Sequence, residues 1–139
     1  MGLLIDTNFI YALHRKNDKN HKAVKKIFKS DIWNSNGPAI TSSLVINETY
    51  TLAMYRTRFN KRLMNDLDLF FWSEDRFFGI LFFSLEDYQE TSNIMSKYST
   101  PNRLLSFVDA SLIYLGKLRK SDIIISFDSH FDDLLKGIC

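Results

Sequence analysis

Four carboxylates stand at positions where the surrounding residues are apolar, and together they could hold a cation. Asp6 follows the apolar run Leu3–Ile5, and Asp128 comes shortly after the apolar run Ile123–Ile125. Both runs have the character of buried parallel strands, so both aspartates should lie at the carboxyl edge of a sheet, where open α/β sheets bind ligands. Taken alone, each aspartate is also an ordinary turn residue at a strand end.

Glu48 and Asp109 interrupt the apolar faces of two expected helices. A carboxylate on such a face is costly to bury unless it is paired or binds a metal, although a glutamate at a helix edge can also reach solvent. Asp109 has a second explanation, because Ser106 precedes it at the spacing of a capping box, and capping is compatible with metal binding. The helical neighbours of Glu48, three and four positions away, are Leu44, Val45, Thr51 and Leu52.

If the first and last strands are sheet neighbours, the four carboxylates converge. Clustered carboxylates repel one another, and a divalent cation removes that penalty. Oxygen ligands with no cysteine and no nearby histidine favour Mg²⁺ or Mn²⁺ over Zn²⁺, and such a site suits metal-assisted hydrolysis of phosphodiesters. His130 follows Asp128 by two residues, but a histidine on a surface helix is the more ordinary interpretation. The sequence contains no Walker, Gly-x-Gly-x-x-Gly or Gly-x-Ser-x-Gly motif.

Short apolar runs alternate with amphipathic segments, which predicts an α/β fold with a central parallel sheet. We expect strands at 2–5, 39–41, 77–83 and 123–126, and the aromatic strand 77–83 should be covered on both faces. We expect helices at 7–13, 20–30, 43–58, 61–72, 84–98, 106–120 and 129–136. Thr7 and Asn8 offer the cap of the first helix.

The composition indicates a globular chain that forms one domain over residues 1–139. It is 45% hydrophobic, with five glycines and two prolines, which excludes disordered and collagen-like classes. A single cysteine excludes a disulfide framework and cysteine-rich zinc modules, and it fits a reducing compartment. No apolar run approaches the length of a membrane span, and we expect a cytoplasmic protein.

Two basic clusters and one aromatic segment suggest binding surfaces. A net charge of +2 does not by itself indicate nucleic-acid binding, and charge runs often mark only solvated helix faces. Phe70, Phe71 and Trp72 are consecutive, so on a helix they cannot all face one core, and we expect an interface at 69–83. The first basic cluster comprises Lys22, Lys25, Lys26 and Lys29. The second, a candidate RNA-binding cluster, comprises Arg56, Arg58, Lys61 and Arg62.

In order and spacing, four segments resemble the acidic motifs of the PIN-domain family. The small size is similar to that of the VapC-type toxin ribonucleases in this family. The resemblance implies a three-layer α/β/α sandwich with a central parallel sheet and an endoribonuclease activity that depends on Mg²⁺ or Mn²⁺. It also implies a homodimer and a small antitoxin that blocks the site. The segments are Leu3–Asn8, Ser42–Glu48, Ser106–Ala110 and Ile125–Phe131.

By this match, Asp6, Glu48, Asp109 and Asp128 are the catalytic, metal-binding acids, while Asn8 and Ser126 are polar residues that support them. The family usually ends in a further strand, for which residues 137–139 leave little room. Two alternatives stay open: a PIN-type nuclease of RNA processing without an antitoxin, and a non-catalytic PIN-like module that binds RNA or protein. A receiver-like signalling domain fits less well, because Ile5 stands where its paired acid would be and Ser126 where its lysine would be.

Overall fold

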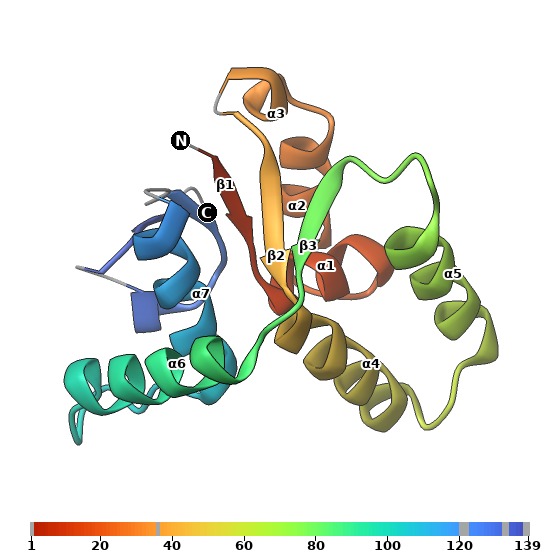
Figure 1. The fold of residues 1–139 in the computed structure, drawn as a ribbon. Coiled ribbons are helices and arrows are strands. Elements are labelled where there is room, and N and C mark those ends of the chain that lie inside the picture. Colours follow the sequence, from red (N-terminus) through yellow and green to blue (C-terminus); the bar gives the residue numbers. More distant parts are fainter. Residues whose placement is uncertain (1, 36, 120–122, 132–133, 138–139) are drawn as a thin grey trace.

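The computed structural model describes residues 2–35, 37–119, 123–131 and 134–137. In these ranges five parallel strands form one sheet in the order β3-β2-β1-β4-β5 (Figure 1). Leu3 at the start of β1 pairs with Ala39 of β2 on one side and with Ile123 of β4 on the other. The strands are β1 (Leu3–Ile5), β2 (Ala39–Ser42), β3 (Phe78–Leu81), β4 (Ile123–Ile125) and β5 (Lys136–Gly137).

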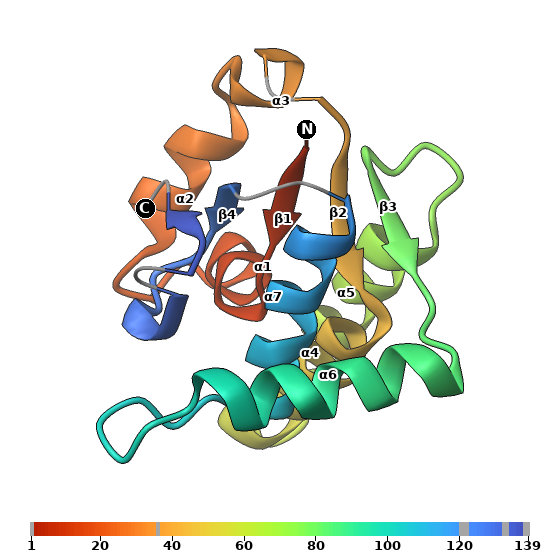
Figure 2. The same cartoon turned by 60° about the vertical axis from the view of Figure 1, so that its left-hand side comes forward.

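Helices cover both faces of the sheet, which makes a three-layer α/β/α sandwich. The helices α6 and α7 lie on one side, and α1, α2 and α5 lie on the other (Figures 1 and 2). The helices are α1 (Thr7–His14), α2 (His21–Phe28), α3 (Ile32–Ser35), α4 (Ser43–Thr57), α5 (Lys61–Trp72), α6 (Leu85–Tyr98) and α7 (Phe107–Arg119). The expected fold class is confirmed.

The strands β1 and β4 form the centre of the core because all of their residues are apolar and buried. Every residue of β1 and β4 is buried, as a parallel sheet with helices on both faces requires. Phe9 of α1 and Leu112 of α7 are also fully buried, and they belong to the same core cluster as these strands. Among the described residues, no helix combines the length and the apolar character that crossing a membrane requires.

Two expectations about the elements were wrong. The strand β3 is not covered on both faces: it lies at the sheet edge, and Phe82 just beyond it is 63% exposed. The expected helix 129–136 is a 3₁₀ turn, Ser129–Phe131, and the chain then pairs with β4 as the short strand β5. This pairing gives backbone groups at the free edge of β4 their partners. The final residues 138–139 lie outside the described ranges, as does Lys120 at the expected end of α7.

The start of α1 also differs from the expectation. Its N-cap is Asp6, whose carboxylate accepts a hydrogen bond from the Thr7 amide at 2.7 Å. Asp6 is the single residue between the end of β1 and the start of α1, so its position is fixed by both elements. A short helix, α3, was not expected from the sequence.

Candidate metal centre

The carboxyl edge of the sheet gathers the four predicted acids at the point where the strand order reverses. From β1 the chain proceeds to β2 and β3 on one side, whereas β4 lies on the other side of β1. Such a switch point is the usual ligand site of an open α/β sheet. Asp6 follows β1, Asp128 follows β4, Glu48 lies in the second turn of α4 after β2, and Asp109 lies in the first turn of α7.

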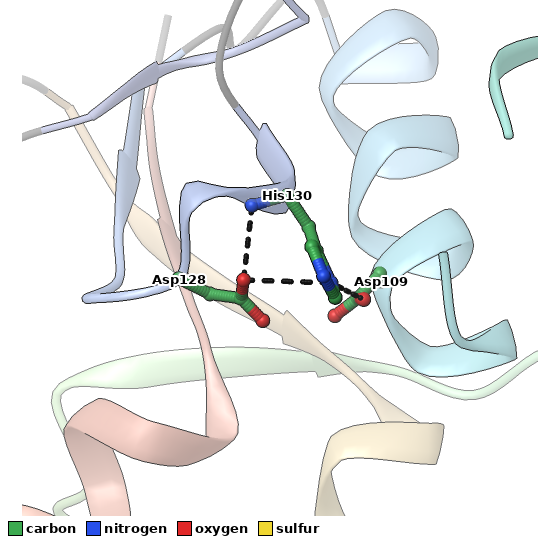
Figure 3. Close-up of side chains that lie close together, drawn as sticks. All are labelled: Asp109, Asp128 and His130. Atoms are coloured by element: carbon green, nitrogen blue, oxygen red, sulfur yellow. Dashed lines mark hydrogen bonds and ion pairs between the residues drawn. The ribbon is translucent and has the colours of Figure 1, made fainter. Parts of the chain in front are cut away.

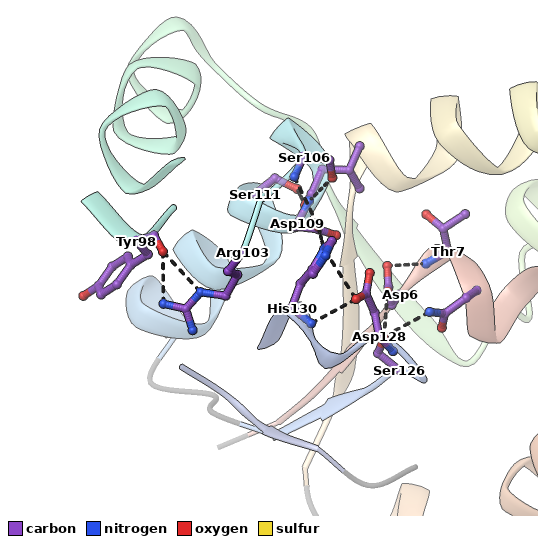
Figure 4. Close-up of polar contacts among 12 residues, drawn as sticks. Asp6, Thr7, Tyr98, Arg103, Ser106, Asp109, Ser111, Ser126, Asp128 and His130 are labelled. Atoms are coloured by element: carbon purple, nitrogen blue, oxygen red, sulfur yellow. Dashed lines mark hydrogen bonds and ion pairs between the residues drawn. The ribbon is translucent and has the colours of Figure 1, made fainter. Parts of the chain in front are cut away.

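Asp6 is held by a polar network that spans β1 and β4 (Figure 4). The Ser126 hydroxyl donates to Asp6 Oδ2 at 2.6 Å and accepts from the Asn8 amide group at 3.1 Å and from the Asp128 backbone N–H at 3.0 Å. Asn8 Oδ1 accepts from the backbone N–H of Phe127 at 3.3 Å. Asn8 and Ser126 therefore tie the loop that carries Asp128 to the carboxylate of Asp6.

Asp109, Asp128 and His130 form the tightest group of possible ligands (Figure 3). One atom from each side chain lies within 4.8 Å of the others. The imidazole Nδ1 is 3.0 Å from Asp109 Oδ2 and 3.4 Å from Asp128 Oδ1. The backbone N–H of His130 donates to Asp128 Oδ1 at 2.9 Å. Asp109 also completes the predicted capping box with Ser106, in bonds of 3.0 and 3.1 Å.

Glu48 and Thr7 border the same site. Charge on Asp109 and Asp128 acts on Glu48, and burial, the larger effect, raises the pKa of this carboxyl above its usual range. The Thr7 hydroxyl opposes this rise, although its oxygen has no hydrogen-bond partner of regular geometry. Thr7 is only 3% exposed, so its hydroxyl does not reach solvent. A buried, unpartnered hydroxyl therefore lies next to a carboxylate.

The electrostatics of the site call for a cation. Burial, together with the charges of Asp109 and Glu48, raises the pKa of Asp6 to about 7 despite its two hydrogen bonds. In the described part of the chain, no lysine or arginine forms an ion pair with any of the four acids, and His130 alone pairs with two of them. Two buried and two partly buried carboxylates without a lysine or arginine partner in the described ranges fit a divalent ion with oxygen ligands.

Two residues near the site were not among the sequence candidates. His130 does not lie on a surface helix, because the turn Ser129–Phe131 packs against α7 and brings the imidazole to Asp109. The hydrogen bond to Asp109 raises the pKa of His130 above its usual range. Arg103 lies close enough to oppose this rise, and it donates to the carbonyl of Tyr98 at 3.0 and 3.2 Å (Figure 4). The spacing Asp-x-His was the only sequence signal for His130.

The second basic cluster is divided by the structure. Arg56 lies over the ring of Tyr11 at 5.2 Å and lines a cavity of about 370 Å³ together with Asn8 and Asp128. Arg62 lines a different cavity, at the start of α5. Arg58 and Lys61 lie at the junction between α4 and α5, at the end of α4 away from Glu48. The first cluster lines a groove on α2 that contains none of the acids.

Several solved structures have the same fold. The structure of VapC20 from Mycobacterium tuberculosis, described as a Sarcin-Ricin loop cleaving toxin, matches with a TM-score of 0.75 at 23% identity, over 94% of this chain and 92% of that one. FitAcB from Neisseria gonorrhoeae matches with a TM-score of 0.69 at 19% identity, over 99% and 96% of the two chains. VapBC2 from Rickettsia felis, bound to a promoter DNA fragment, matches with 0.68 at 13%, over 99% and 98%.

The sequence comparisons agree with the fold. Among curated proteins, none matches this sequence significantly. The family model of the PIN domain matches residues 3–136, a span that includes all four acids and both supporting polar residues. The chain therefore belongs to the PIN domain family.

Proposed function

We propose that residues 1–139 form one nuclease domain, a metal-dependent endoribonuclease that hydrolyses RNA phosphodiesters. The observation that carries this proposal is the set of four carboxylates at the switch point of the sheet, of which Asp6 and Asp109 are buried. Burial raises the pKa of Asp6 to about 7, and none of the four has a lysine or arginine partner among the described residues. A module that only binds RNA has no use for mutually repelling acids, since they weaken its attraction for phosphates.

In this proposal Asp6, Glu48, Asp109 and Asp128 hold Mg²⁺ or Mn²⁺. When bound, the ion activates a water molecule and stabilises the leaving oxygen of the phosphodiester. The hydrogen bonds of Ser126 and Asn8 hold the Asp128 loop in a fixed position relative to the Asp6 carboxylate. The buried Thr7 hydroxyl lies beside Glu48 and lowers the pKa of that carboxyl, so it would help to keep Glu48 ionised as a ligand.

We further propose that the chain is the toxin of a toxin–antitoxin pair. The support is the likeness to VapC20, to FitAcB and to a toxin–antitoxin complex from Klebsiella pneumoniae, the last with a TM-score of 0.63 at 15% identity. A small antitoxin that covers the acidic site is then the expected partner. Co-expression with the product of an adjacent small gene should suppress the cleavage described below.

The test of the proposed activity is cleavage of a structured RNA by the purified chain. We expect cleavage with Mg²⁺ or Mn²⁺, none in EDTA, and recovery when either ion is added back in excess. A single-stranded DNA of the same sequence is the matched substrate control. Persistence of cleavage at the full rate in EDTA would show that the activity is independent of metal.

We expect Arg56 to contribute more to RNA binding than any lysine of the first cluster. Its guanidinium lines the cavity that contains Asp128, whereas the α2 lysines line a separate groove. Arg56→Gln should reduce the slope of log affinity against log salt by about one, because one phosphate contact is lost. The measurement is RNA titration at several salt concentrations in a non-cleaving Asp6→Asn background, with Lys26→Gln as the matched control. If neither substitution changes the slope relative to the Asp6→Asn parent, both side chains belong to solvated surfaces.

We expect a homodimer formed through α5. Phe71 is fully buried, but Leu69 is 70% exposed and Trp72 is 52% exposed, and their spacing places them on one helical face. Exposed apolar side chains of this size are typical of interfaces. Leu69→Glu should convert a dimer into a monomer in sedimentation velocity at tens of micromolar, without loss of folding. Leu104→Glu, at a residue that is 71% exposed outside α5, is the control and should leave the dimer intact.

A further inference from the structure

We propose that the imidazole of His130 is a direct ligand of the cation and gives this site a preference for transition-metal ions such as Mn²⁺ over Mg²⁺. The inference rests on the proposed function, because it concerns the same site. It adds a nitrogen ligand to the four acids.

The spacing of the three side chains supports coordination. Nδ1 of His130 is 3.0 and 3.4 Å from one oxygen each of Asp109 and Asp128. Neighbouring ligand atoms of an octahedral ion with bonds of about 2.1 Å lie about 3 Å apart. The three ligand atoms also lie within 4.8 Å of one another, close to the distance of about 4.2 Å that separates opposite ligands of such an ion. Asp6 and Glu48 do not belong to this tight group, although the charge of Asp109 acts on both of them.

The orientation of His130 is fixed from three directions. Its backbone N–H donates to Asp128 Oδ1, which holds that carboxylate beside the ring. Asp109 is held by the backbone N–H of Ser106 in the first turn of α7. Phe131, the next residue, is 2% exposed and anchors the turn in the core. The side chain of His130 itself is 38% exposed, so burial does not force it inward, and it lies in the site because it contacts the two carboxylates.

A nitrogen ligand changes which ion is preferred. Mg²⁺ is bound by oxygen ligands and keeps several of its waters, whereas an imidazole nitrogen binds divalent transition metals, least strongly Mn²⁺ and more strongly Fe²⁺, Ni²⁺ and Zn²⁺. A site of carboxylates and one imidazole therefore gains affinity for Mn²⁺ and for the later divalent ions, while its affinity for Mg²⁺ depends on the carboxylates alone. The alternative is that His130 only neutralises Asp109 and Asp128. In that case the imidazole competes with every cation for the two carboxylates, and its removal changes the affinities for Mn²⁺ and Mg²⁺ by the same factor.

The test compares Mn²⁺ and Mg²⁺ binding by calorimetric titration of the whole chain. His130→Ala should raise the Kd of Mn²⁺ by at least about 10-fold, and it should change the Kd of Mg²⁺ by less than a factor of two. His130→Gln, which keeps a polar side chain, should behave in the same way and serves if the alanine variant unfolds. Asp128→Asn is the matched control and should weaken both ions.

A spectroscopic measurement separates coordination from an indirect effect through Asp109. Electron spin-echo modulation from an imidazole ¹⁴N should be present on Mn²⁺ bound to the wild-type chain and absent in the His130 variants. Equal changes in both dissociation constants, or no ¹⁴N modulation in the wild type, would overturn the inference and leave the proposed function intact. Failure of the wild type to bind either ion would overturn the proposed function itself.

Discussion

Asp6→Asn should abolish RNA cleavage while leaving the fold intact. The variant keeps the shape of the side chain but removes the charge that faces the proposed ion. Loss of a residue that only supports a metal ligand costs about 10–100-fold, so loss of a ligand should cost more than about 100-fold in cleavage rate. The backbone N–H of Thr7 keeps an oxygen acceptor in the variant, so the cap of α1 survives.

The rate is best measured with saturating Mn²⁺ on a labelled RNA, together with circular dichroism to verify the fold. Glu90→Gln, which removes an exposed carboxylate from α6, is the matched control and should cleave at the wild-type rate. A folded Asp6→Asn variant that cleaves as fast as the wild type would exclude Asp6 from the site.

The same substitution should stabilise the metal-free protein at neutral pH, by an amount that grows as pH rises. The pKa of Asp6 is raised from 3.8 to about 7 in the folded chain, mainly by burial. Between these values the folded chain binds more protons than the unfolded chain, so raising the pH lowers the free energy of unfolding. The stabilising difference between variant and wild type should grow by about 2–3 kcal/mol from pH 5 to pH 8.

Chemical unfolding in EDTA at the two pH values measures this difference. The Ser126 hydroxyl donates to one oxygen of the Asp6 carboxylate and the Thr7 N–H donates to the other. Asparagine has a single oxygen, so the variant loses one of these hydrogen bonds, worth about 1 kcal/mol, which offsets part of the gain. This offset is independent of pH, so the pH dependence is the decisive quantity. Added Mn²⁺ should stabilise the wild type more than the variant. If the difference in the free energy of unfolding does not change with pH, the pKa of Asp6 is the same in the folded and the unfolded chain.

Local features of the chain could be predicted from the sequence because they depend on neighbouring residues. The helix 61–72 begins and ends as expected, since Asn60 caps its first turn. The helix expected at 84–98 forms as α6, and its N-cap Ser84 makes a capping box with Asp87. The apolar runs at 3–5 and 123–125 are strands. Each of these outcomes follows from side-chain periodicity and capping within a few residues.

The edges of the sheet could not be predicted in this way. The run 77–83 is apolar throughout, yet β3 lies at the edge, because strand order depends on which elements pack together rather than on the composition of one strand. The two-residue strand β5 forms only because β4 offers an unpaired edge. A segment this short has no periodicity from which it could be recognised.

The candidate site shows the same division. Its four acids could be chosen from the sequence, because a carboxylate among apolar residues is costly and needs a reason. Only the tertiary structure decided that β1 lies between β2 and β4, which brings Asp6 and Asp128 to one switch point across more than a hundred residues of chain. It also decided that His130 turns toward Asp109 and that Arg56, alone among the four residues of the second basic cluster, lines a cavity with Asp128. These contacts join elements that are distant in sequence, and they form because the apolar faces of the elements must be buried together, which no local pattern encodes.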